Sequence, residues 1–185
     1  MINSELFADL GIPIDYGRHP RRPGYAEAAE LEDVEPNILG RMQRLAPQTA
    51  RAWREMKAAA LADGVELLLV SGFRSVRYQA DLIRKKLAAG QDIASILKVN
   101  AAPGFSEHHT GRAVDVATPG SRPLTNDFDG TRAFAWLRDH AQRHGFSMPY
   151  GPDNVYGFAY EPWHWSQLGA RAKRRPKDLD PPLTT

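Results

Sequence analysis

The sequence contains no cysteine among its 185 residues. Without thiols the chain cannot form disulfides, thiolate nucleophiles, cysteine-based zinc knuckles or cysteine-ligated iron–sulfur clusters. Any metal in this protein must therefore be held by histidine and carboxylate side chains.

Long hydrophobic runs are also absent. No stretch approaches the roughly 18 consecutive apolar residues of a membrane span, and residues 1–17 lack a cationic leader followed by an apolar segment. We therefore expect neither a membrane-spanning helix nor a signal peptide. The expected location is cytoplasmic for the chain as given, or periplasmic or extracellular if a leader was trimmed or export uses another route.

The sequence also lacks a large excess of charge of either sign. The 24 Lys and Arg against 22 Asp and Glu leave a formal net charge of +2. So small a surplus indicates neither a nucleic-acid partner nor a membrane surface. The length favours one domain, and we expect a monomer.

Apolar periodicity predicts a mixed chain of helices and short strands. Helices are expected over 47–62, 75–90 and 131–144, with a short helical turn over 92–97. Strands are expected over 65–70 and 112–118, and a hairpin is expected from 146–150 and 157–167. The fold class predicted is α+β, a single domain with a small, mainly antiparallel sheet and helices packed on it.

The two ends of the chain differ from this middle part in composition. Residues 1–45 carry several prolines and no sustained period, which predicts an extended N-terminal arm. Residues 170–185 are basic and then proline-rich, which predicts a tail without regular structure. The remaining segment, 46–169, is predicted to form the folded domain.

Two segments pair a histidine with a carboxylate. In the first, His108 or His109 lies in a loop and Asp115 lies in the following predicted strand, so loop and strand can bring an imidazole and a carboxylate together. A lone Asp in an alternating strand is usually exposed to solvent. The combination with a second such segment, in a chain without cysteine, indicates a metal site made of His and carboxylate ligands.

The second segment contains Glu161 and His164 amid aromatic residues. Pro162 disfavours a helical conformation at Glu161, so the helical HExxH zinc signature is absent. In a regular strand positions 161 and 164 would point to opposite faces, so a bend or bulge is needed to bring both into one cleft.

The sequence resembles the zinc D-alanyl-D-alanine carboxypeptidases of the VanY type, a group shared with VanX dipeptidases, lysostaphin-like endopeptidases and hedgehog domains. The resemblance rests on Ser106-x-His108-x6-Asp115 with Gly111 between, on Glu161-Pro162-Trp163-His164-Trp165, and on Ser71-Gly72-Phe73-Arg74-Ser75 with Gln79. It spans about residues 66–169 and implies that His108, Asp115 and His164 bind one Zn²⁺ per chain. The serine at position 106 selects His108 over His109.

The resemblance also implies roles for the other motif residues. Glu161 would be the general base and acid, and Arg74 would hold a substrate oxygen. Ser106, Gln79 and Trp163 are candidate substrate-binding residues, although each also suits a structural role as a turn serine, a core-edge amide or a core aromatic. The remaining histidines that we expect to be bystanders are His19, His109, His140 and His144.

The function implied is removal of the terminal D-alanine from peptidoglycan stem peptides or precursors. Alternatives within the family are an endolysin-like endopeptidase, an L,D-carboxypeptidase and a D-Ala-D-Ala dipeptidase. A zinc-retaining wall-binding module without activity is the alternative from another class. Glu161 argues against this last alternative, because hydrolysis needs that carboxylate and zinc binding does not.

Overall fold

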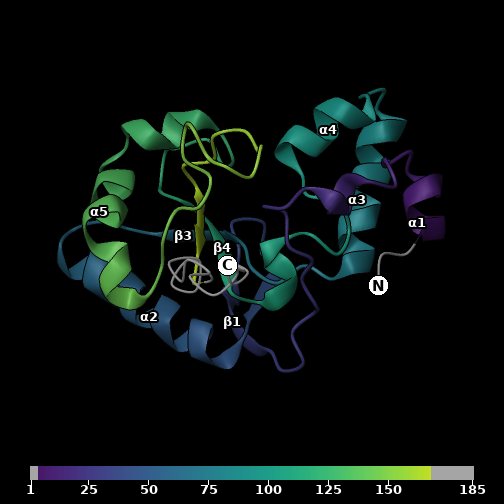
Figure 1. Cartoon of the computed structure of the whole chain (residues 1–185). Coiled ribbons are helices and arrows are strands. Elements are labelled where there is room, and N and C mark those ends of the chain that lie inside the picture. The colour runs from purple at the N-terminus through teal and green to yellow at the C-terminus, as the bar shows by residue number, and fades with distance from the viewer. Residues whose placement is uncertain (1–3, 168–185) are drawn as a thin grey trace, which may run out of the picture.

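A computed structural model of the protein describes residues 4–167 (Figure 1). The predicted tail, 170–185, lies outside the described residues. No helix in the described range is both long enough and apolar enough to cross a membrane.

The centre of the fold is a three-stranded antiparallel sheet in the order β3 (Leu68–Ser71), β4 (Ala113–Ala117) and β5 (His164–Ser166). All five residues of β4 are buried, because both faces of this central strand are covered. The register places Asp115 opposite Ser71 on one side and opposite His164 on the other. The predicted α+β class with a small antiparallel sheet is confirmed.

One face of the sheet packs against helices α2 (Pro47–Ala62) and α5 (Arg132–His140), which lie on the left and below in Figure 1. The core between them includes Trp53, Leu69, Val114 and Trp165, all nearly inaccessible to solvent. Thr131 caps α5 by accepting a hydrogen bond from the Phe134 amide. The helix predicted over 131–144 thus forms, with its last turn a 3-10 helix, η4 (Ala141–His144).

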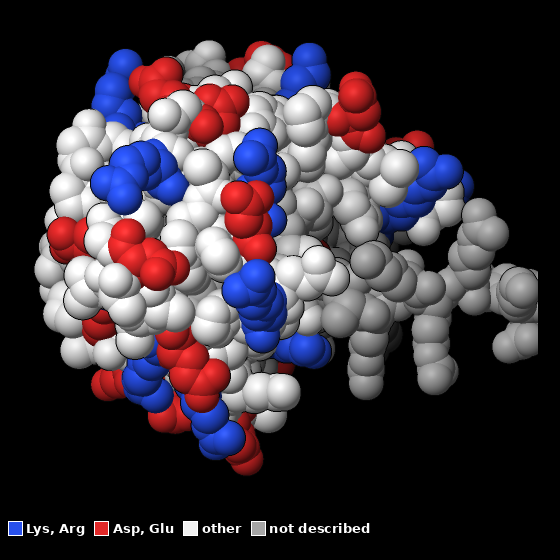
Figure 2. Space-filling view, turned by 90° about the vertical axis from the view of Figure 1, so that its left-hand side faces the viewer, with Lys and Arg blue, Asp and Glu red and all other residues white. Residues whose placement is uncertain are grey.

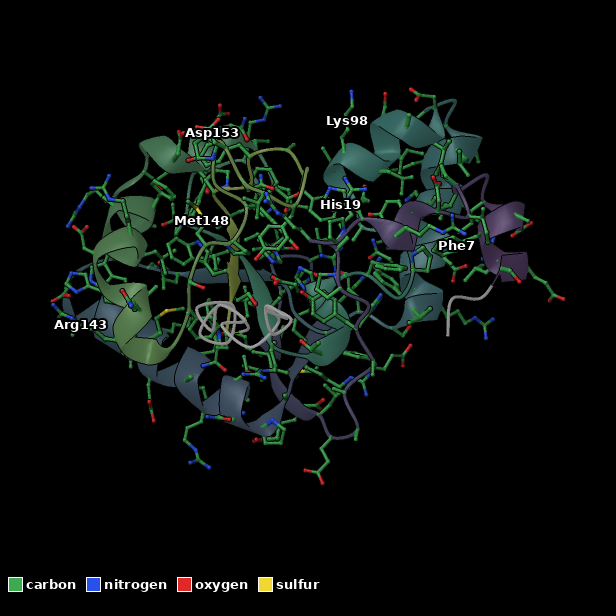
Figure 3. All side chains as sticks on the ribbon, in the orientation of Figure 1. Phe7, His19, Lys98, Arg143, Met148 and Asp153 are labelled. Carbon is green, nitrogen blue, oxygen red and sulfur yellow. The ribbon has the colours of Figure 1, made fainter. Side chains whose placement is uncertain are left out.

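A second cluster joins α1 (Ser4–Asp9), α3 (Val76–Ala88) and α4 (Ile93–Val99), on the right of Figure 1. Phe7 of α1, labelled in Figure 3, is buried with Ile83 of α3 and Ile96 of α4. Ser75 caps α3 as predicted, because its side chain accepts a hydrogen bond from the Tyr78 amide at 3.0 Å. The short helix expected at 92–97 is α4.

The N-terminal segment differs from the extended arm that we predicted. Besides α1 it forms η1 (Tyr16–Arg18) and an antiparallel hairpin of β1 (Glu32–Pro36) and β2 (Met42–Leu45). Neither strand of the hairpin has a clear apolar alternation, so its pairing was not visible in the sequence. Contacts with distant residues hold it, including the Asn37 amide, which donates to the Val70 carbonyl at 3.0 Å.

The predicted C-terminal hairpin is wrong. Residues 146–150 contribute one isolated bridge, Ser147 to Ser166, and β5 is only three residues long and pairs with β4. The Asn154 side chain instead folds the intervening loop, donating to the carbonyls of Gly151 and Phe158. Two short 3-10 helices, η2 (Glu107–Thr110) and η3 (Asn126–Gly130), complete the described elements.

The surface of the α5 side carries positive and negative side chains interspersed, without a large field of one sign (Figure 2). This distribution on the face shown fits the small net charge.

Candidate active site

The three predicted metal ligands come together in the structure. One donor atom from each of His108, Asp115 and His164 lies within 4.8 Å of the others, and all three side chains are buried. His108 comes from η2, Asp115 from the middle of β4, and His164 from the first position of β5. Two imidazoles and one carboxylate are a donor set that suits catalytic zinc.

A left-handed glycine helps to direct His108 into this group. Gly111 ends η2 with φ +64°, and its carbonyl accepts a hydrogen bond from the Ala46 amide at 2.9 Å. The chain can therefore turn directly from η2 into β4, which begins two residues later. His108 and Asp115 face each other across this turn, with Nε2 3.2 Å from Oδ1.

The other ring nitrogen of His108 fixes its tautomer. Nδ1 lies 2.7 Å from the carbonyl oxygen of Gly72. A carbonyl can only accept, so Nδ1 carries the hydrogen and Nε2 has a free lone pair. Histidine ligands of metals are commonly oriented in this way.

His164 is held by two carboxylates. Its Nδ1 lies 3.0 Å from Asp115 Oδ1 and its Nε2 lies 2.9 Å from Glu107 Oε2. The ring of Tyr150 stacks on it, with centroids 4.7 Å apart. Sequence reasoning missed Glu107. Its position next to His108, in a loop dense in titratable groups, was the available signal for a role at the site. The direction of its side chain depends on η2 and could not be read from the sequence.

The surroundings of the two histidines shift their pKa values in opposite directions. Burial, together with the positive charge of Arg74, lowers the pKa of His108 to about 4. Burial alone would lower the pKa of His164 as well, but its hydrogen bonds to Asp115 and Glu107 raise that pKa to about 10. The pKa of Asp115 is held well below its usual range by His108, His164 and Arg74, against the effect of burial.

Glu161 lies in the same cavity as His164 and Arg74. It is 8% exposed, and burial raises its pKa to about 7. The bend that the pleat required is a turn over 162–163, in which the His164 amide donates to the Glu161 carbonyl at 3.1 Å. A carboxyl group with a pKa near neutrality, beside a candidate metal site, is suited to accept and return a proton.

Arg74 borders the metal group. Its Nη2 lies 3.4 Å from Asp115 Oδ2 and its Nη1 lies 3.4 Å from Gln79 Oε1. Its Nε is the one buried side-chain nitrogen or oxygen without a hydrogen-bond partner within residues 4–167. The guanidinium thus retains a donor for an oxygen atom of a ligand.

The predicted substrate-binding residues are placed differently from one another. Gln79 and Ser106 line the cavity with Glu161, and the Gln79 amide also donates to the Ala101 carbonyl at 2.8 Å. Trp163 packs against the hydrophobic core. Its role in substrate binding stays a prediction.

The expected bystander histidines lie outside the metal group. His109 is buried, with Nδ1 2.6 Å from the Arg74 carbonyl, while its Nε2 accepts from the Gly104 amide at 3.0 Å. It therefore braces the backbone that carries Arg74. His140 and His144 lie against Trp136, and His19 is exposed.

Comparison with known proteins gives consistent matches. The sequence pattern of the VanY family, described as D-alanyl-D-alanine carboxypeptidase, matches residues 42–170. The chain is 31% identical over 165 residues to the putative carboxypeptidase YodJ of Bacillus subtilis (strain 168), covering 85% of this chain and 60% of YodJ. The chain thus spans about three fifths of the length of that relative.

Two solved structures extend the comparison. The LdcB LD-carboxypeptidase superimposes with a TM-score of 0.68 at 30% identity, covering 81% of this chain and 74% of LdcB. A variant of the vancomycin-resistance D,D-pentapeptidase VanY in complex with Zn(II) gives a TM-score of 0.61 at 29% identity, covering 77% of this chain and 80% of that one.

Proposed function

We propose that this chain, which belongs to the VanY family of D-alanyl-D-alanine carboxypeptidases, is a zinc-dependent carboxypeptidase that removes the terminal D-alanine from peptidoglycan stem peptides or precursors. The observation that carries the proposal is the convergence of His108, Asp115 and His164 beside Glu161. The donor set fits zinc because it offers two imidazoles and a carboxylate, and the His108 tautomer leaves Nε2 free.

Each residue has a distinct part in the proposed mechanism. His108, Asp115 and His164 would hold zinc, which supplies Lewis acidity toward the scissile carbonyl and toward water. Glu161 takes a proton from the attacking water and returns it to the leaving amine. Arg74 donates to the carbonyl oxygen as negative charge develops there, or to the terminal carboxylate of the substrate.

Removal of one residue from a free C-terminus requires recognition of a carboxylate. Arg74, Ser106 and Gln79 bring donors to a cavity of about 30 Å³ beside Glu161. These donors suit recognition of a terminal carboxylate.

An L,D-carboxypeptidase is the second candidate. The similarity to LdcB, at a TM-score of 0.68, favours it, since that protein is an LD-carboxypeptidase. Incubation of the zinc-loaded protein with defined muropeptides ending in D-Ala-D-Ala or in L-Lys-D-Ala, followed by mass spectrometry, distinguishes the two. Loss of one alanine from the first substrate supports the proposal, loss from the second alone supports the L,D assignment, and cleavage of neither rejects both.

Amidation of the terminal carboxylate separates exo- from endopeptidase activity. We expect the C-terminal amide of a D-Ala-D-Ala pentapeptide to lose kcat/KM by about 30-fold or more, because a buried charge pair costs roughly 2–5 kcal/mol when one partner is removed. Equal kcat/KM for acid and amide would reject the carboxypeptidase assignment and favour an endopeptidase.

A further inference from the structure

A second cavity adjoins the active site on the side of the N-terminal hairpin. It has a volume of about 460 Å³ and lies between β2, the end of β3 and the start of α3. Arg74 lines both this cavity and the one that contains Glu161, and Asp115 also borders it. The two cavities therefore share Arg74 as a common wall.

The walls of this cavity combine exposed apolar side chains with arginines. Leu39, Met42, Tyr78 and Leu124 line it and are 72%, 53%, 45% and 48% exposed. Arg41 and Arg44 also line it, and both are exposed. Asp115, already engaged by two histidines and Arg74, is the only acidic residue of the lining in the part of the chain that the structure describes.

The two arginines have no carboxylate partner within residues 4–167. Asp33 is the cross-strand neighbour of Arg44, yet no ion pair joins them. The guanidinium of Arg44 lies instead over the ring of Phe73, 5.5 Å from its centroid. Phe73 directly precedes Arg74, so this stacking places a positive charge near the catalytic cavity.

The hairpin that carries these arginines is fixed to the active-site backbone. The Phe73 amide donates to the Arg44 carbonyl at 2.8 Å, and the Gly72 amide donates to the Gln43 side chain at 2.9 Å. A Cβ on Gly72 would lie 2.7 Å from the Arg44 carbonyl oxygen, so only glycine allows this approach. The arginines are therefore held on a preorganised surface, which lowers the entropic cost of binding.

We propose that this cavity, lined by Arg41, Arg44 and Tyr78, binds the part of the peptide substrate that precedes the scissile bond, and that the two arginines select a carboxylate side chain there. This inference rests on the proposed function. Arg74, which we propose holds a substrate oxygen, lines both cavities, so a peptide bound at Arg74 can extend into the larger one. Charge complementarity then favours an acidic peptide over a neutral one.

The test is a scan of acetylated pentapeptides that end in D-Ala-D-Ala, or in L-Lys-D-Ala if only that terminus is cleaved, with one Glu at each preceding position and Gln in matched controls. We expect kcat/KM to be about three- to tenfold higher with Glu at one position, as for partly exposed charge pairs, and to lose this preference at high salt. The double variant Arg41→Gln/Arg44→Gln should abolish the preference, so that it hydrolyses each Glu peptide and its Gln control with equal kcat/KM.

The matched control is Arg51→Gln, which removes an exposed arginine on α2, away from the cavity, and should retain the preference. A wild-type protein indifferent to Glu at every position, or a double variant that keeps the preference, would overturn the inference. Binding of the same labelled peptides to the zinc-loaded Glu161→Gln protein, measured by fluorescence anisotropy, tests the cavity even if no peptide is hydrolysed. If the wild-type protein hydrolyses no peptide but the Glu161→Gln protein still binds Glu peptides more tightly than their Gln controls, only the proposed function is rejected.

Discussion

At the scale of single residues, the site is organised around one carboxylate. Asp115 is within hydrogen-bond reach of His108, His164 and Arg74, and it lies on the central strand where both faces are buried. The pKa of Asp115 is lowered by its partners, whereas burial raises the pKa of nearby Glu161 to about 7. Two carboxylates with such different environments suit two different roles, metal ligand and proton carrier.

Replacement of Glu161 by Gln separates these roles. The amide keeps the shape of the side chain but cannot accept a proton, so the peptidase rate should fall by about 10²–10⁴ while zinc content is unchanged. Steady-state kinetics and elemental analysis on the same preparation check both parts. Retention of more than a third of the rate would exclude Glu161 as the base, and loss of zinc would identify it as a ligand.

At the scale of elements, the turn between η2 and β4 is the connection on which the site depends. Gly111 adopts φ +64°, and a Cβ there would lie 2.7 Å from the Ala46 amide nitrogen. The backbone of the segment that follows the hairpin therefore fits directly against this turn. Both the left-handed conformation and the close approach require glycine.

The variant Gly111→Ala should destabilise the fold by more than the cost of placing alanine in a left-handed backbone conformation. We expect a loss of more than about 2 kcal/mol in the free energy of unfolding, since strain of the left-handed residue is compounded by a backbone clash. Gly90→Ala is the matched control, because Gly90 has φ +83° but nothing within 4 Å of its added Cβ, and should cost about 1–2 kcal/mol. Denaturant titration measures both, and equal losses would contradict a role for the contact with Ala46.

At the scale of the whole molecule, the metal site joins segments that are far apart in the chain. His108 and Asp115 belong to one segment, whereas His164 is 49 residues from Asp115 and is delivered by β5. The complete site exists only when the sheet has formed, so zinc should bind the folded chain much more tightly than the unfolded one.

Zinc should therefore stabilise the protein by linkage. At a free zinc concentration 100 times its Kd the expected gain is about 2.7 kcal/mol, seen as a higher Tm that chelator reverses. The variants His164→Ala and His108→Ala each remove one ligand and should lose most of this gain. An unchanged Tm on chelation of protein shown to contain zinc would contradict this coupling.

Much of the local structure followed from the sequence alone. Apolar spacing predicted α2, α3 and α5, because a helix that packs on a hydrophobic cluster must present one apolar face at the helical period. The absence of cysteine and two segments that pair a histidine with a carboxylate predicted a site of His and carboxylate ligands, and the resemblance to the VanY type selected His108 over His109. The structure brings His108, Asp115 and His164 together. The alternation of side chains along a strand indicated that a bend was needed to bring Glu161 and His164 into one cavity.

Only the tertiary structure decided the partners of these residues. The hairpin of β1 and β2, the pairing of β5 with β4, the contact of Glu107 with His164 and the bracing of Arg74 by His109 all join residues that are distant in the chain. Such contacts depend on which backbone groups remain unpaired once the sheet and helices have packed. Sequence periodicity reports which face of an element is buried, but the neighbour that buries it is selected by the fold as a whole.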